Sequence, residues 1–247
     1  MPSVDMFGPE FAEVYDLTYR RRGKDYAAEA AMVARVARER RPDASSLLDV
    51  ACGTGEHLAK LRDNFADVAG LDASQAMIDL ARTKLPGVPV HRGDMRSFDA
   101  GRSFDVVTCL FSSIGYLMSV ADLRSAMRSM ARHLTPGGIL LVEPLWLPEQ
   151  FIDGYVAGDV LEQNGHTLAR VSHSTRDGQT VRMDIHYLVA GGGAIRHIAE
   201  SHLNTLFTRD EYLDAVTDAG CAAEFLPGGP SGRGLLVGIR HTEGSPS

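Results

Sequence analysis

The feature that most constrains this chain is a short apolar strand that runs through a glycine turn into a helix. Residues 47–51 form the strand, Gly53 and Gly55 form the turn, and a helical pattern begins at Glu56. Because glycine has no Cβ, the backbone of such a turn can bend sharply and approach a bound molecule closely. When the strand is the first of a parallel sheet, the turn lies at the switch point where ligands bind. We therefore expect a small-molecule site just after residue 51.

Apolar strands alternate with amphipathic helices along much of the chain, which is typical of a parallel sheet covered on both faces. The pattern predicts an α/β protein with a doubly wound, mostly parallel sheet of seven strands. The strands are expected at residues 47–51, 67–71, 88–91, 104–110, 139–142, 222–226 and 235–240. The helices are expected at residues 26–41, 56–64, 74–85, 120–134 and 209–219.

The stretch from residue 145 to residue 207 departs from this rhythm. Residues 168–174, 181–189 and 195–206 alternate polar and apolar side chains between glycine turns, which predicts an inserted antiparallel sheet that caps the core. The expected plan is an N-terminal cap with the ligand-binding core over 1–144, the insertion over 145–207, completion of the core over 208–241 and a disordered tail over 242–247.

Charge and cysteine usage narrow the function classes. The chain has 25 Lys and Arg against 32 Asp and Glu, a net charge of −7, which argues against attachment to nucleic acid or an anionic membrane. The three cysteines lack the spacing of a zinc module or a disulfide scaffold, and no apolar run is long enough for a membrane span. We therefore expect a soluble, cytoplasmic protein with no metal, no nucleic-acid partner and no membrane partner.

Two further polar positions follow strands of the predicted sheet. Asp72 ends the second strand, where a carboxylate can accept hydrogen bonds from both hydroxyls of a ribose, and the turn over residues 93–95 follows the third strand. Three positions after Gly55 stands Leu58, where a pyrophosphate-binding fold needs a third glycine. These positions favour a nucleoside ligand and argue against a nicotinamide-dependent reductase.

The run Asp-Val-Ala-Cys-Gly-Thr-Gly at residues 49–55, the acidic Asp72 and the turn Gly-Asp-Met at residues 93–95 resemble the three cofactor motifs of class I S-adenosylmethionine-dependent methyltransferases. The resemblance implies S-adenosylmethionine as cofactor and a class I methyltransferase sheet. It covers three strand ends at the correct spacing, which makes it much more specific than the glycine turn alone.

By this resemblance, Ala51 and Gly53 would face the methionine and ribose parts of the cofactor, and Asp72 the ribose hydroxyls. Asp94 would meet the adenine amine, with Met95 beside the ring. The implied cofactor-binding residues are Tyr15, Ala51, Gly53, Gly55, Asp72, Ala73, Met77, Asp94, Met95 and Leu110.

The resemblance narrows over nearly the whole chain. Six segments are similar to the N,N-dimethyltransferases of antibiotic deoxyaminosugar biosynthesis, such as those making desosamine and mycaminose: residues 14–17, 22–26, 111–116, 154–159, 172–176 and 227–235. This similarity implies a dTDP-linked 3-amino-deoxyhexose as substrate, N,N-dimethylation of its amino group, and a homodimer in which residues 145–207 serve substrate and dimer contacts.

Tyr15, Tyr116 and His173 are the candidate catalytic residues. A neutral amine aligned with an electrophilic methyl group needs positioning more than a dedicated base. Tyr116 follows the fourth strand, at the edge of the sheet where substrates bind, but some relatives carry His at this position, so no role as base is implied for it. The alternative interpretation of Tyr15 is that it only packs an N-terminal helix over the cofactor.

The diphosphate of a nucleotide sugar needs a local basic site in a protein of net negative charge. The turn over residues 230–234 offers Ser231, Arg233 and several backbone N–H groups, although an ordinary turn with a solvated arginine would have the same sequence. Tyr155 is expected to stack on a thymine or sugar ring. The candidate substrate-binding residues are Lys24, Tyr155, Arg170, Ser174, Arg176, Ser231 and Arg233.

Two other functions remain open at this point. An N-methyltransferase that acts on a 4-amino sugar or on another small amine would share the cofactor motifs, and for an unrelated amine Ser231 and Arg233 would not be needed. A non-catalytic cofactor-binding module would also share those motifs, but the large insertion with its polar aromatic residues argues against it.

Overall fold

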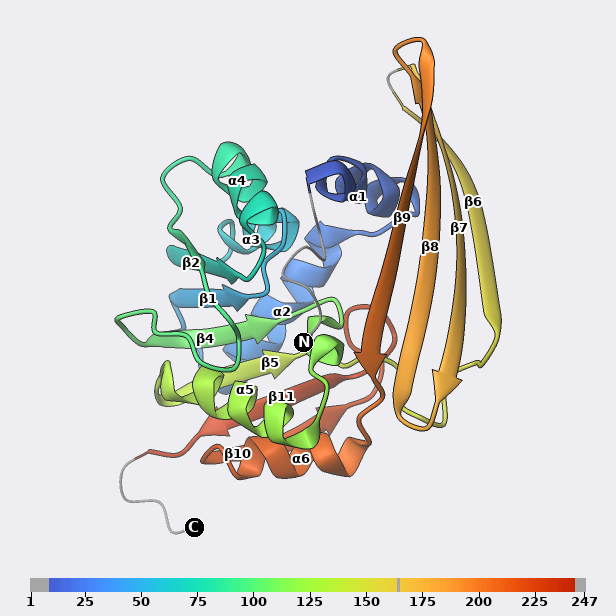
Figure 1. Ribbon diagram of the computed structural model, residues 1–247. Helices are drawn as coiled ribbons and strands as arrows, with labels where there is room; N and C mark the ends of the chain where they lie inside the picture. Colours follow the sequence, from blue (N-terminus) through green and yellow to red (C-terminus); the bar gives the residue numbers. More distant parts are fainter. Residues whose placement is uncertain (1–8, 164, 243–247) are drawn as a thin grey trace.

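The computed structural model describes residues 9–163 and 165–242, which form two β-sheets (Figure 1). The larger sheet has the strand order β10-β11-β5-β4-β1-β2-β3; β1 to β5 pair in parallel, and β11 runs antiparallel to both of its neighbours, β5 and β10. The order reverses between β1 and β4, so their carboxyl ends border the crevice where such sheets bind ligands. The strands are β1 (Ser46–Val50), β2 (Asp67–Asp72), β3 (Val90–Arg92), β4 (Phe104–Cys109), β5 (Leu134–Val142), β10 (Cys221–Leu226) and β11 (Leu235–Arg240).

Helices cover both faces of the larger sheet, which explains why its central strands are apolar along their length. Leu58 and Ile78 belong to the core on one face, and Met127 and Tyr212 belong to the core on the other. None of the described helices is long and apolar enough to cross a membrane. The helices of these two faces are α2 (Tyr26–Arg40), α3 (Glu56–Leu61), α4 (Gln75–Lys84), α5 (Val120–Arg132) and α6 (Arg209–Thr217).

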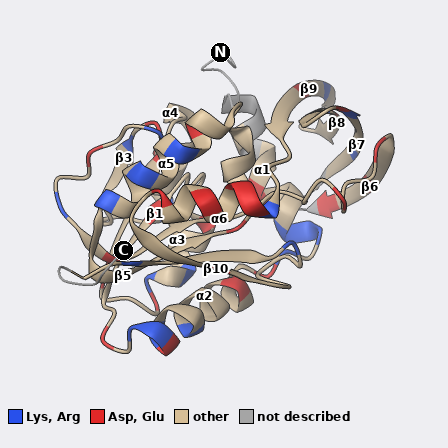
Figure 2. Cartoon of the chain, turned by 90° about the horizontal axis from the view of Figure 1, so that it is seen from below, with Lys and Arg blue, Asp and Glu red and all other residues tan. Residues whose placement is uncertain are grey.

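Capping residues in the sequence start several of these helices. The carboxylate of Asp25 accepts the N–H groups of residues 27 and 28 at the start of α2, and Thr208 and Glu211 form a reciprocal capping box on α6. Acidic residues lie in the first turn of α6 and basic residues in the last turn of α2, where the helix dipole favours each charge. Figure 2 shows acidic and basic residues interspersed along α2.

The second sheet is antiparallel, with the order β6-β7-β8-β9. Successive side chains point to opposite faces, so Leu168, Ile185 and Ile198 are buried on an inner face, whereas Val171 and Leu188 are exposed on an outer face. Figure 1 shows α1 (Pro9–Arg21) between α4 and this sheet, over the edge of the larger sheet. The strands are β6 (Tyr155–Gln163), β7 (His166–Asp177), β8 (Thr180–Gly191) and β9 (Ala194–Thr205).

The predicted fold class is confirmed: a seven-stranded, mostly parallel sheet is accompanied by a separate antiparallel one. The sequence analysis missed the strand β6, because Val156 and Val160 point to the outer face and Asp159 points inward, where it pairs with Arg22 at 3.0 Å. It also missed the short 3₁₀ helix η1 (Ser113–Tyr116). Of the tail predicted to be disordered, residues 243–247 lie outside the described residues.

Candidate active site

The glycine turn after β1 has the backbone that its sequence predicts. Ala51, Gly53 and Gly55 all have positive φ angles, of 58°, 55° and 82°. A Cβ added to Gly53 would meet no atom within 4 Å, so this face of the turn is open to a ligand. A Cβ on Gly55 would lie 3.0 Å from the side chain of Leu85, so this second glycine serves packing against α4 rather than the open face.

Asp72, at the end of β2, joins the glycine turn to the next helix. Its carboxylate accepts the N–H of Gly53 at 2.8 Å and the N–H of Ser74 at 2.8 Å. Burial raises the pKa of this carboxyl. A carboxylate offers about four lone-pair sites, and the N–H groups of Gly53, Ser74 and Ala73 use up to three of them. Asp72 is therefore placed to accept a hydrogen bond from a ribose hydroxyl.

A small cavity of about 30 Å³ lies at the carboxyl ends of β1 and β4. Ala51 and Gly53 line it from β1, Leu110 from β4, and Tyr15 closes it from α1. Asp49 also lines it, and burial raises the pKa of its carboxyl to about 6. The open face of Gly53 and the carboxylate of Asp72 are the groups that would hold S-adenosylmethionine. The cavity between Tyr15 and the turn has room for about one water, so it would have to widen to admit the cofactor.

Other predicted cofactor residues lie farther from this cavity. The Asp94 carboxylate is held by Arg96, with Nε–Oδ1 at 3.0 Å, and this hydrogen bond lowers the pKa of Asp94. Met95 packs partly buried against the core, and Ala73 is exposed beside Asp72. Met77 is buried with α1 and the inner face of the second sheet. Their contact with a cofactor remains a proposal.

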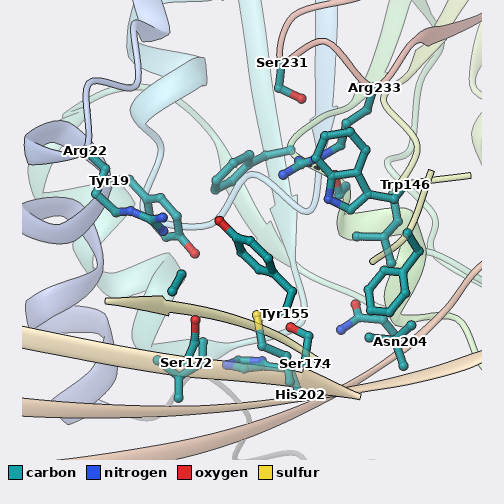
Figure 3. A pocket seen from close by; sticks show the side chains of 18 of the residues that line it. Tyr19, Arg22, Trp146, Tyr155, Ser172, Ser174, His202, Asn204, Ser231 and Arg233 are labelled. Atoms are coloured by element: carbon teal, nitrogen blue, oxygen red, sulfur yellow. Dashed lines mark hydrogen bonds between the residues drawn. The ribbon is translucent and has the colours of Figure 1, made fainter. Parts of the chain in front are cut away.

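A second, much larger cavity of about 680 Å³ extends from the edge of the larger sheet to the inner face of the second sheet (Figure 3). It shares Tyr15, Phe111 and Ser113 with the small cavity, so the two spaces adjoin. Its wall carries residues from both sheets and from α1, including Tyr19, Trp146, Tyr155, Ser172, Ser174, His202 and Asn204.

The loop before β11 brings Ser231 and Arg233, two of the predicted substrate-binding residues, to this cavity. The Ser231 hydroxyl donates to Glu143, a fully buried carboxylate at the end of β5. Arg233 donates from Nη1 to the Ser112 hydroxyl at 2.8 Å, and its guanidinium lies 4.9 Å from the centre of the Trp146 ring. Within the described residues the Nε of Arg233 is buried and has no hydrogen-bond partner, while the guanidinium as a whole lines the cavity, where its charge can attract an anion.

Lys24 reaches the same cavity from the segment between α1 and α2. Its Nζ is held by Glu29 at 2.7 and 2.8 Å and lies 3.7 Å from the centre of the Phe111 ring. Glu29 also contacts His57 Nε2 at 2.6 Å. Burial lowers the pKa of Lys24, while these contacts help to keep it charged. Lys24 thus meets the cavity with its charge already partly balanced.

Aromatic side chains form the wall between the two cavities. Tyr15 and Tyr19 lie one turn apart on α1 with ring centres 4.7 Å apart, and Tyr19 meets Phe111 edge to face at 4.8 Å. Tyr116, at the end of η1, contacts His202 on β9, with the phenol oxygen 3.1 Å from Nδ1. Burial raises the pKa of Tyr15, Tyr19 and Tyr116. These groups therefore stay protonated phenols at neutral pH.

Arg170, on the inner face of β7, is a predicted substrate residue that lines the large cavity with Ser174 and Tyr155. Its Nη1 donates to Ser172 at 2.9 Å. Among the described residues its buried Nε has no hydrogen-bond partner, as for Arg233. Two largely buried arginines, Arg170 and Arg233, therefore line the cavity.

The structure does not bring His173 or Arg176 to the cavity. His173 is exposed on the outer face of the second sheet, because it is one residue out of phase with Ser172 and Ser174. Arg176 instead donates to the carbonyl oxygens of Pro148 and Gly178, each at 2.7 Å, and so holds loops together. The predictions of a catalytic His173 and a substrate-binding Arg176 therefore find no support in this geometry.

Several lining residues were missed by the sequence analysis. Tyr19 follows Tyr15 by one helical turn, and Trp146 is the single tryptophan of the chain, close after β5. His202 shares the parity of Ile198 on β9, so the alternation could have placed both on one face. Glu143 gave no signal, because a carboxylate at the end of an apolar strand has no distinctive spacing. The described residues contain no cluster of three side chains suited to a metal.

Known proteins match this chain over most of its length. Residues 47–138 match the family described as a methyltransferase domain. A dTDP-3-amino-3,4,6-trideoxy-alpha-D-glucopyranose N,N-dimethyltransferase from Streptomyces venezuelae is 52% identical over 95% of this chain and 99% of its own length. A dTDP-4-amino-2,3,4,6-tetradeoxy-D-glucose N,N-dimethyltransferase from Saccharopolyspora spinosa is 50% identical over 96% of this chain and 95% of its own.

A solved structure agrees with these relatives. The structure of SAM-bound CalS10, an amino pentose methyltransferase from Micromonospora echinaspora involved in calicheamicin biosynthesis, has a TM-score of 0.86 to this chain. The two sequences are 50% identical, and the match covers 92% of this chain and 96% of the CalS10 chain. The similarity includes the second sheet as well as the methyltransferase sheet, because it extends far beyond residues 47–138.

Proposed function

Because this chain belongs to the S-adenosylmethionine-dependent sugar N-methyltransferases, we propose that it transfers two methyl groups in turn to the amino group of a dTDP-linked 3-amino-deoxyhexose. The observation that carries the proposal is the pair of adjoining cavities that share Tyr15. One has the groups that suit a nucleoside cofactor, and the other has the size and charge for a nucleotide sugar.

The charge of the large cavity suits an anionic substrate. The cavity is lined by four basic residues and one carboxylate, although the net charge of the chain is −7: Arg22, Lys24, Arg170 and Arg233, and Glu29. We assign the diphosphate to Arg233 and Ser231, since a charged hydrogen bond to a buried guanidinium is stronger than a neutral one. Tyr155, which is 54% exposed at the cavity mouth, is assigned to stack on the thymine or sugar ring.

In the proposed reaction, the chain's own residues act mainly by binding and orienting. When bound, S-adenosylmethionine supplies an electrophilic sulfonium methyl group. Asp72 and the open face of Gly53 would hold the cofactor, and Tyr15 and Tyr116 would border the reacting amine. Orientation of two reactants can account for roughly 7–11 kcal/mol of a barrier, so positioning alone explains much of the rate.

The phenols that border the amine are unsuited to act as bases. Burial raises the pKa of both Tyr15 and Tyr116, so neither releases its proton near neutral pH. An ammonium substrate would therefore lose its proton to water before the methyl transfer, and the residues around it would accept its N–H groups.

The position of the amine on the sugar is the next question. Relatives named for 3-amino and for 4-amino sugars are 52% and 50% identical to this chain, so overall identity does not separate them. We take the 3-amino sugar as the leading substrate. A 4-amino sugar is the competing one, and an unrelated small amine is the third candidate.

We also propose that a second copy of this chain covers the outer face of the second sheet, with residues 145–207 as the unit for substrate and dimer contacts. Val160, Val171 and Ile195 are 71%, 54% and 73% exposed there, which forms an apolar surface unusual for a monomer. Val171→Glu is expected to give a monomer by light scattering during gel filtration. Met118→Glu, at an exposed apolar residue outside this sheet, is the control and should leave a dimer. A Val171→Glu protein that remains dimeric would contradict this assignment.

The proposed reaction is placed in the cytoplasm, where thiols stay reduced. Cys52, Cys109 and Cys221 are free thiols, which is consistent with that compartment.

The function is tested by incubating the protein with S-adenosylmethionine and a dTDP-3-amino-3,6-dideoxyhexose and following the products by mass spectrometry. Successive additions of one and then two methyl groups are expected. The matched 4-amino sugar is assayed in parallel, and a preference for it would make the 4-amino sugar the assigned substrate. No product from either sugar would overturn the proposed substrate class.

A further inference from the structure

Tyr116, the last residue of η1, and His202, on β9, meet at the wall of the large cavity, where His202 is seen in Figure 3. Phe111 and Ser112 have positive φ angles of 54° and 62°, which turn the chain sharply after β4 and direct η1 toward β9. A Cβ on Gly115 would lie 3.1 Å from the Leu145 side chain, so a glycine allows this close packing. The result is the 3.1 Å contact between the phenol oxygen of Tyr116 and Nδ1 of His202.

Burial fixes the protonation of both partners. His202 is 1% exposed, and burial together with the nearby Arg170 lowers the pKa of its imidazole to about 4. At neutral pH the ring is therefore neutral and has one N–H and one lone pair. Burial raises the pKa of Tyr116, which keeps its proton. The contact can then have one of two directions: the phenol donates to Nδ1, or Nδ1–H donates to the phenol oxygen.

We propose that His202 is a positioning residue whose unprotonated Nδ1 accepts the Tyr116 hydroxyl, so that the phenol oxygen presents only lone pairs to the substrate amine. The inference rests on the proposed function, because it concerns an amine in this cavity. A hydroxyl pointing into the cavity would donate its proton to the lone pair of the amine nitrogen. That lone pair must form the new N–C bond. A phenol oxygen turned by His202 instead accepts an amine N–H and leaves the nitrogen lone pair available.

The same arrangement serves both methyl transfers. A neutral primary amine has two N–H bonds and the secondary amine that follows has one, so each can donate to the Tyr116 oxygen. Tyr116 thus supplies an acceptor for both transfers without changing its protonation, and His202 determines the direction of its hydroxyl. His202 acts through Tyr116 and needs no contact with the substrate.

The direction of the hydrogen bond can be measured without substrate. Protein with ¹⁵N-labelled histidine gives separate signals for protonated and unprotonated ring nitrogens, and the His202→Asn variant identifies the signals of His202. An unprotonated Nδ1 with a protonated Nε2 at neutral pH is the expected result. A protonated Nδ1 would overturn the proposal.

Kinetics with the aminosugar test the consequence. His202→Leu removes the acceptor, so kcat is expected to fall about 10-fold to 100-fold, as misorientation of reactants does, with KM and adenosylhomocysteine affinity changed less than about 3-fold. His202→Asn is expected to restore most of the lost rate, since its Oδ1 and the Nδ1 of histidine are both bonded to Cγ. In a Tyr116→Phe background, adding His202→Leu should change kcat less than about twofold.

The matched control is Ile198→Val, a buried position on the inner face of β9 outside the cavity wall. A loss of kcat in His202→Leu that persists in the Tyr116→Phe background, or no loss at all, would overturn the proposal. If the wild-type protein methylates no aminosugar, the proposed function fails, and the ¹⁵N measurement still decides the direction of the Tyr116 hydroxyl.

Discussion

The two sheets of this protein build their parts of the site in different ways. At the larger sheet, the key residues follow one another along the chain: Gly53 and Asp72 are 19 residues apart and are joined by one hydrogen bond. Around the large cavity, which extends to the second sheet, the contacts join distant segments. Tyr116 and His202 are 86 residues apart, and Ser112 and Arg233 are 121 residues apart. The cofactor region is thus made by local strand–turn–helix units, whereas the substrate region is made by packing between units.

This difference predicts where single substitutions should act. Changes at the strand ends of the larger sheet should alter cofactor affinity and leave sugar binding intact. Changes at the cavity wall facing the second sheet should leave cofactor affinity intact and alter either sugar binding or the rate of methyl transfer. Four predictions test the separation, beginning with the largest effect.

Asp72→Ala should weaken binding of S-adenosylhomocysteine about 1000-fold, because it removes a charged acceptor for the ribose and the partner of the Gly53 N–H. Isothermal titration calorimetry measures the loss. Asp79→Ala, at an exposed carboxylate on α4 that meets Gln75, is the control and should bind normally. Affinity within 3-fold of wild type for Asp72→Ala would remove Asp72 from the cofactor site.

The cofactor region could be anticipated because its signals are local. The apolar run of β1, the two glycines and Asp72 each mark the end of a strand, and parallel strands carry such ends to one edge. What the sequence did not reveal is the division of labour between the glycines. Gly53 leaves its face open, while Gly55 makes room for Leu85 of the following helix segment, and this depends on tertiary packing.

Arg233→Ala should raise KM for the dTDP-aminosugar roughly 30-fold, the size expected for losing a charged hydrogen bond to phosphate. The affinity for S-adenosylhomocysteine should stay the same, which separates the two regions. Steady-state kinetics and calorimetry on the same preparation give both values. Arg209→Ala is the control, because that arginine lies on α6 over the ring of Phe225. An unchanged KM in Arg233→Ala would contradict the phosphate assignment.

Burial has opposite pH consequences in the two regions. Burial raises the pKa of Asp49 in β1 from 3.8 to about 6, so the folded chain loses stability as pH rises through this range. Burial lowers the pKa of His202 in β9 from 6.5 to about 4, so the folded chain loses stability as pH falls below 6.5. As the pH rises from about 5 to 8, the free energy of unfolding of Asp49→Asn should increase by about 1 kcal/mol relative to wild type. As the pH falls from about 8 to 5, the free energy of unfolding of His202→Asn should increase by about 2 kcal/mol relative to wild type.

Urea unfolding of both variants and the wild type at the two pH values measures how the free energy of unfolding changes with pH. Asparagine keeps an acceptor for the Thr108 hydroxyl at position 49, so the comparison isolates the charge. If the free energy of unfolding, relative to wild type, changed with pH in the same direction in both variants, the assigned protonation states would be contradicted.

The substrate region was harder to anticipate. The alternation of β7 correctly separates Ser172 and Ser174 from His173, but it does not tell which set faces the cavity. That choice depends on α1 and the larger sheet, which cover the inner face. The sequence analysis named both His173 and Ser174, which lie on opposite faces of β7, and did not single out His202. Arg176 was assigned to substrate by its charge, although it binds the carbonyl oxygens of two loops.

The smallest effect is expected where the two regions are joined by α1. The segment that follows α1 carries Arg22, which pairs with Asp159 of β6 at 3.0 Å, with side chains 33% and 29% exposed. A partly exposed pair of this kind contributes about 0.5 kcal/mol. Arg22→Gln and Asp159→Asn should therefore lower stability equally and change KM for the aminosugar less than about 3-fold. If Arg22→Gln alone raised KM more than about 10-fold, its guanidinium would bind the substrate phosphates instead. The end of α1 would then belong to the substrate region, and the boundary between the two regions would have to be moved onto this helix.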